Sequence, residues 1–94
     1  MKVTRSSSKI RQASGINSKL IKGVIVLIEP NKKYLQELNP VASRLWELCS
    51  KPITEKKLIT AISKEYKIDQ QTAAEDIKIW IKDYLDQGLL TQLD

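Results

Sequence analysis

The chain contains no histidine and no phenylalanine, and Cys49 is its only cysteine. A single cysteine cannot form a disulfide within the chain, and without histidine a mixed cysteine and histidine metal site cannot be assembled. No apolar run approaches the roughly 20 residues of a membrane-spanning helix, and Met1–Ser8 lacks the apolar core of a secretory signal. We therefore expect a cytoplasmic protein, without a cofactor, whose stability comes from packing.

The length and composition of the chain are those of one globular domain. Its 94 residues can enclose one hydrophobic core but are too few for two. Hydrophobic residues make up 41% and charged residues 29%, a balance that excludes both the disordered and the membrane-embedded classes.

The excess positive charge is confined to the N-terminal third. Residues 1–33 carry eight basic side chains against Glu29 alone, whereas residues 34–94 carry eight basic and ten acidic side chains. Such a segment favours acidic partners, which a precursor peptide or an enzyme surface satisfies as readily as a nucleic acid, or it is simply solvated. We expect residues 1–18 to form a basic, Ser-rich, partly flexible segment, whose serine run is a modification site or plain disorder, and residues 19–94 to form the domain.

The first half of the domain has the pattern of strands. A short strand is expected around Ile10–Ala13, and the β-branched run Gly23–Ile28 predicts a strand covered on both faces. Glu29–Lys32 is a good turn sequence, and Lys33–Leu38 then returns as a strand whose charged start suits a sheet edge.

After Leu38 the apolar spacing changes to that of helices. Capping residues predict that three helices begin after Asn39, Thr54 and Asp69, and Pro40 suits the first position of the first helix. Gly88 is placed to end the last helix. Each predicted helix has one apolar stripe, and these comprise Ala42, Leu45, Trp46 and Cys49; Leu58, Ile59, Ile62 and Tyr66; and Ala73, Ile77, Trp80, Ile81 and Tyr84. We expect the strands to precede all three helices.

Several of these segments together resemble the PqqD-like family, the recognition elements for ribosomally made precursor peptides. The resemblance rests on IEPNKKYLQELNP at Ile28–Pro40, LWEL at Leu45–Leu48, DI at Asp76–Ile77, WI at Trp80–Ile81 and GLL at Gly88–Leu90, and it covers roughly residues 20–91. Its most specific part is the hairpin that runs into the Leu-Asn-Pro helix start.

The resemblance implies an α+β fold, a three-stranded antiparallel sheet followed by a three-helix bundle, similar to a winged helix. Family members bind the leader of a precursor peptide as an extra strand between the third strand and the third helix, and they do no chemistry. The implied partner is a modifying enzyme, either the leader peptidase and cyclase of a lasso-peptide pathway or a radical-SAM maturase. The Tyr34–Pro40 junction is closer to the lasso type.

The residues themselves agree with strand addition. An edge strand offers unpaired N–H and C=O groups at every second residue, which an extended peptide can satisfy, while pockets beside a neighbouring helix supply selectivity. We expect the peptide to contact the edge strand and one flank of the third helix, at Lys33, Tyr34, Leu35, Gln36, Glu37, Leu38, Asp76, Ile79, Trp80 and Asp83.

Each of these residues also has a purely structural interpretation. One exposed isoleucine at position 79 is normal on any surface, and Trp80 can be a core residue. Cys49 lies on an apolar stripe and is expected to be structural, and Lys56 and Lys57 form a solvated face or a docking surface. Neighbouring carboxylates in a helix point about 100° apart, so Glu75 beside Asp76 is a poor acid and base pair. No catalytic or metal residue is predicted.

Two other functions fit a small domain of this kind. A winged-helix DNA-binding domain has three helices, but it places its wing after the third, and the predicted third helix carries four acidic side chains against two lysines. A dimerisation module would pair Tyr34–Leu38 edges across a two-fold axis. We expect no specific nucleic-acid or membrane binding, and a monomer or a weak dimer.

Overall fold

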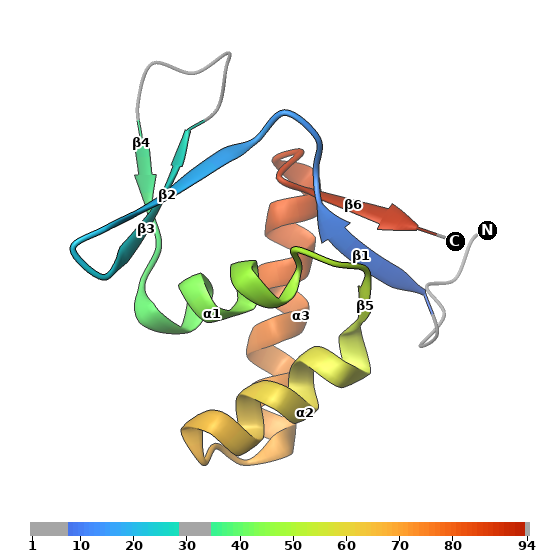
Figure 1. The fold of residues 1–94 in the computed structure, drawn as a ribbon. Helices are drawn as coiled ribbons and strands as arrows, with labels where there is room; N and C mark the ends of the chain where they lie inside the picture. The colour runs from blue at the N-terminus through green and yellow to red at the C-terminus, as the bar shows by residue number, and fades with distance from the viewer. Residues whose placement is uncertain (1–7, 29–34, 94) are drawn as a thin grey trace.

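A computed structural model describes residues 8–28 and 35–93 of the chain (Figure 1). The predicted turn at Glu29–Lys32, and the predicted peptide contacts Lys33 and Tyr34, lie outside the described residues. The elements follow in the order β1 (Lys9–Gln12), β2 (Asn17–Ile21), β3 (Val24–Ile28), β4 (Leu35–Glu37), α1 (Pro40–Leu48), β5 (Ile53–Thr54), α2 (Glu55–Tyr66), α3 (Gln70–Asp86) and β6 (Leu90–Leu93).

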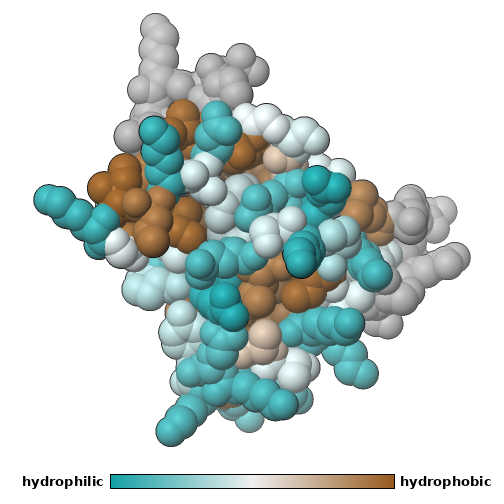
Figure 2. Space-filling model, in the orientation of Figure 1, coloured by the Kyte–Doolittle hydropathy of each residue, from teal (hydrophilic) through white to brown (hydrophobic). Residues whose placement is uncertain are grey.

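Strands β2, β3 and β4 form an antiparallel sheet in that order, with β3 in the middle. β2 and β3 are joined by Lys22 and Gly23, which have φ angles of 52° and 82°. Two positive φ values in a row give a two-residue turn whose twist matches that of the strands. Every residue of β2 is exposed, whereas the centre of β3 is buried. Figure 2 shows apolar surface gathered where Figure 1 places the turn end of this hairpin.

A second sheet holds the two ends of the described chain together. β1 lies between β5 and β6 and pairs antiparallel with both, so the first and last strands run side by side (Figure 1). Ile10 of β1 is 5% exposed and belongs to the core. The folded part of the chain therefore includes β1, which lies inside the segment that the sequence analysis separated from the domain.

The predicted fold class, α+β with a three-stranded antiparallel sheet and three helices, is confirmed. The predicted order, with all strands before the helices, is wrong, because β5 lies between α1 and α2 and β6 follows α3. The single strand after α3 pairs with the N-terminal β1 rather than folding back as a wing.

The three helices begin at the predicted caps. Each capping side chain accepts from a backbone N–H of the first helical turn. Asn39 accepts from Ala42 over 2.8 Å, and Thr54 accepts from Lys57 over 3.2 Å. Asp69 accepts from Gln71 over 3.0 Å and from Thr72 over 3.3 Å. Gly88, with φ of 77°, follows the end of α3 as predicted. None of the helices that the structure describes combines the length and apolar character needed to cross a bilayer.

The predicted stripes on α1 and α3 form most of the core. The residues that are at most 2% exposed with the largest side chains are Trp46, Leu27, Leu58, Ile62, Ile77, Leu89 and Cys49. Tyr66 was expected on the buried face of α2, and this is wrong: it is 39% exposed, and its hydroxyl donates to the carbonyl oxygen of Pro40 over 3.4 Å. Lys67 ends α2 with φ of 53°, directly after Tyr66.

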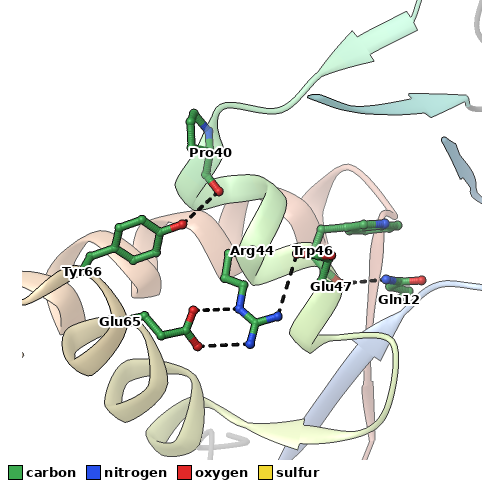
Figure 3. Close-up of polar contacts among 7 residues, drawn as sticks. All are labelled: Gln12, Pro40, Arg44, Trp46, Glu47, Glu65 and Tyr66. Atoms are coloured by element: carbon green, nitrogen blue, oxygen red, sulfur yellow. Dashed lines mark hydrogen bonds and ion pairs between the residues drawn. The ribbon is translucent and has the colours of Figure 1, made fainter. Parts of the chain in front are cut away.

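Polar contacts join α1 to α2 on the outside of the bundle (Figure 3). The Arg44 guanidinium donates to both carboxylate oxygens of Glu65, over 2.8 and 3.1 Å, and lies 3.8 Å from the carboxylate of Glu47. The hydrogen bond from Arg44 lowers the pKa of Glu65. Since both side chains are well exposed, the pair orients the helices more than it stabilises them.

Candidate peptide-binding site

Strand β4 forms one open edge of the first sheet, because among the described strands it pairs only with β3. The Leu38 N–H donates to the Ile25 carbonyl over 2.9 Å. Backbone groups of an antiparallel strand point alternately toward and away from a neighbour, so the N–H of Gln36 also points to β3 and that of Glu37 points outward. The N–H and C=O of Glu37 are therefore presented to the open edge.

An aromatic cluster on α3 lies beside β4. The Gln36 amide donates to the Tyr84 hydroxyl over a long 3.5 Å, and the Tyr84 ring stacks on Trp80 with centroids 4.3 Å apart and planes inclined by 31°. Tyr84 is 6% exposed, and burial raises the pKa of its hydroxyl, which stays protonated at neutral pH. Gln36 thus connects the edge strand to the helix that was predicted to flank it.

Trp80 brings an indole N–H to this cluster. This N–H is buried and makes no well-formed hydrogen bond to the described residues, but it lies close enough to the Tyr84 hydroxyl to offset part of the rise that burial causes in the pKa of that group. Trp80 therefore contributes mainly apolar ring surface to this flank of α3, stacked on Tyr84.

The other residues predicted on α3 form a strip on the same flank of the helix. Asp76, Ile79 and Asp83 are all exposed, and Ile79 is 62% exposed. At 100° per residue they lie on the side of the buried stripe where Trp80 is found. Among the described residues no hydrogen bond or ion pair joins this strip to β4. The structure brings Gln36 to Tyr84, which stacks on Trp80, and leaves Asp76, Ile79 and Asp83 open to solvent.

One of the predicted strand residues is placed differently. Leu38 was expected at the edge, but it is 4% exposed and its N–H is bonded to Ile25, so it supports the core. Leu35 is part of β4. Tyr84, which sequence reasoning assigned to the core stripe alone, is the residue that joins β4 to α3. Its spacing of four residues from Trp80 was the available signal, since such positions are neighbours on a helix.

Three observations describe the chemical character of the groups in and around this site. Burial raises the pKa of the Cys49 thiol to about 12, so this side chain is not a nucleophile at neutral pH. In the described residues no group of three side chains is placed to hold a metal ion. The exposed face of α3 carries four acidic side chains, which would be repelled by a phosphate backbone.

A model of the family described as "Coenzyme PQQ synthesis protein D (PqqD)" matches residues 24–90, well over half of the chain. The chain belongs to the PqqD family. The matched region runs from β3 into β6 and includes β4 and α3, so both sides of the candidate site lie within it. Strands β1 and β2 precede the PqqD match.

A solved structure described as "TbiB1 in Complex with the TbiA(beta) Leader Peptide" has a similar fold. Its TM-score is 0.77 and its sequence identity is 24%, and the alignment covers 85% of this chain and 93% of that one. The likeness shows that this member of the PqqD family shares the fold of TbiB1. A comparison with curated proteins gave no match.

Proposed function

We propose that this protein binds the leader segment of a ribosomally made precursor peptide as an added strand along β4, and presents the peptide to a modifying enzyme. The observation that carries the proposal is the open edge at Glu37, connected through Gln36 and Tyr84 to a flank of α3 that exposes Ile79. Membership of the PqqD family and the leader peptide bound by the similarly folded TbiB1 support it.

The contacts divide between backbone and side chains. The leader backbone pairs with the outward groups of β4, which confers little sequence preference. Selectivity comes from leader side chains that enter the space between β4 and α3, where Ile79 and Trp80 supply apolar surface. Asp76 and Asp83 on the same flank favour a basic leader residue near the apolar one.

The protein acts without catalysing a reaction. The modification is carried out by a partner enzyme in the cytoplasm, and we favour the leader peptidase and cyclase of a lasso-type pathway over a radical-SAM maturase. The genes beside this one distinguish the two, because each pathway places its own enzymes next to a short precursor gene with a cleavable leader.

Calorimetric titration with a synthetic leader, taken from the precursor encoded beside this gene, tests the proposal. We expect saturable binding of one leader per chain, and no binding of a scrambled leader of the same composition. Mass spectrometry of the full precursor incubated with the protein alone should show no change of mass. Equal affinity for both peptides, or turnover without a partner, would contradict the proposal.

A further inference from the structure

The opposite edge of the same sheet borders an open cavity of about 480 Å³. Gln12 of β1, Leu20 of β2, Ile25 of β3 and Trp46 of α1 are among the residues that line it. The cavity therefore lies where β2 extends past α1, at the edge of the sheet that is farthest from β4 in strand order. Strands β1, β2 and β3 and helix α1 thus meet at a site that the leader proposal does not use.

The apolar wall of the cavity exists because β2 overhangs the core. Leu20 is directly opposite Ile25 in the β2–β3 register, so the two side chains are on the same face of the sheet. Ile25 is 7% exposed and belongs to the core, whereas Leu20 is 72% exposed. The helices cover this face over β3 and leave it open over β2.

The backbone of β2 also has unused pairing capacity on the cavity side. Because the Ile25 carbonyl points to β4, the backbone groups of Val26 point to its β2 partner Lys19. By the same alternation, the N–H and C=O of Ser18 and Leu20 point away from β3, to the free edge of β2. Leu20 thus offers an apolar side chain and outward backbone groups together.

The Trp46 side chain, with its indole N–H, is among the residues that line this cavity. Trp46 is 1% exposed, and its indole N–H has no acceptor among the described residues. The Gln12 amide donates to the backbone carbonyl of Trp46 over 2.7 Å, which fixes the wall on that side (Figure 3). A ligand carbonyl oxygen that entered the cavity and reached this N–H would satisfy it.

The charge around the cavity selects the kind of ligand. Residues 8–28 carry Lys9, Arg11, Lys19 and Lys22 and no acidic side chain, and the cavity itself is lined by Lys19 together with Glu47 of α1, so the positive excess comes from the surrounding strands. An extended segment with apolar side chains and acidic flanks complements this combination of sheet edge, apolar wall and positive charge.

We propose that the β2 edge and this cavity bind an extended, apolar segment with acidic flanks that belongs to a second protein, while a leader peptide occupies β4. One apolar side chain of the segment fills the cavity against Leu20, and one of its carbonyl oxygens accepts from the Trp46 indole. The inference rests on the proposed function only in taking the modifying enzyme as the source of the segment. The two edges of one sheet would then hold the substrate and the enzyme that acts on it.

Nuclear magnetic resonance of the two tryptophan indoles tests the inference. The probe is the capped pentapeptide acetyl-Asp-Val-Leu-Val-Glu-amide, titrated into the full chain. We expect the indole N–H signal of Trp46 to move to lower field with saturable dependence on the probe, and that of Trp80 to stay in place. A titration that leaves the Trp46 signal unchanged up to millimolar probe overturns the inference.

A matched pair of variants assigns the contact. Leu20→Thr is expected to weaken probe binding about 10-fold, because it removes apolar surface from the cavity wall. Ile21→Thr makes a similar change at the next residue, which is 48% exposed and points to the other face of the sheet, and should change the affinity less than about 2-fold. Equal weakening by both variants contradicts the proposed contact.

Protein saturated with leader separates the two proposals. If each site is as proposed, the leader leaves the affinity for the probe unchanged and does not move the Trp46 signal. If the leader instead weakens binding of the probe and also shifts the Trp46 indole signal, then the leader itself occupies the cavity. That result overturns this inference. A leader that binds nowhere removes the proposed function, while a Trp46 shift with the probe still supports the cavity site.

Discussion

Replacing Ile79 with aspartate is expected to weaken leader binding about 10- to 100-fold while leaving thermal unfolding almost unchanged. Burying a leucine-sized leader side chain against Ile79 contributes about 1.5–3 kcal/mol, and each 1.4 kcal/mol changes the dissociation constant tenfold. The substitution removes that apolar surface and adds a third carboxylate beside Asp76 and Asp83. Since Ile79 is 62% exposed, the fold does not depend on it. Calorimetric titration and thermal melting of the same preparation measure both effects.

Ile79→Ala is the control for the added charge. It removes most of the apolar surface without a carboxylate and should give a smaller loss of affinity than Ile79→Asp. If Ile79→Asp binds the leader normally, the peptide lies on the other flank of α3, near Lys78 and Leu85, and the proposed site is wrong although strand addition can still hold.

Replacing Ile77 with aspartate, only two residues earlier on the same helix, is expected to unfold the domain. Ile77 is 2% exposed in the core, so the new carboxylate would be buried without a partner. A buried unpaired charge combined with the loss of a core side chain costs more than about 4 kcal/mol, against a total stability of about 5–15 kcal/mol for a domain. Circular dichroism with urea denaturation measures the loss.

Ile77→Val is the matched control and should cost about 0.5–1.5 kcal/mol, because it removes one buried methylene. If Ile77→Asp unfolds cooperatively with the same urea midpoint as the unsubstituted protein, the assignment of this face of α3 to the core is wrong.

The elements that were predicted from the sequence are those determined locally. The caps Asn39, Thr54 and Asp69 and the apolar stripes on α1 and α3 depend on neighbours within about one helical turn, so their patterns are readable without the fold. The stripe of α2 was extended one turn too far, to Tyr66, because apolar spacing does not show where a helix reaches the edge of its core.

The elements that were not predicted depend on partners far away in the chain. β2 is exposed throughout, so it shows no apolar alternation, and its turn at Lys22 and Gly23 lacks the usual Asn-Gly signal. β5 and β6 become strands by pairing with β1, and Lys9 contacts Thr54 in one direction and Leu93 in the other. Pairing over such separations has no local pattern.

The candidate site was predictable in outline and not in detail. An open edge could be inferred from the charged, mixed character of the strand before Asn39, and the exposure of Ile79 from helical spacing. The role of Tyr84 could not, because its position on the apolar stripe already accounts for an aromatic residue there. Its hydroxyl becomes relevant only when β4 places Gln36 beside it.

Amide hydrogen exchange along β4, measured with and without saturating leader, tests strand addition most directly. The N–H of Glu37 points to the open edge, so we predict that its exchange slows by at least about tenfold when the leader pairs with it. The N–H of Gln36 is already directed at β3 and serves as the internal control, and that of Leu20 on the opposite edge should not respond to the leader. Unchanged exchange at Glu37 in the leader-saturated protein would contradict the addition of a strand at β4.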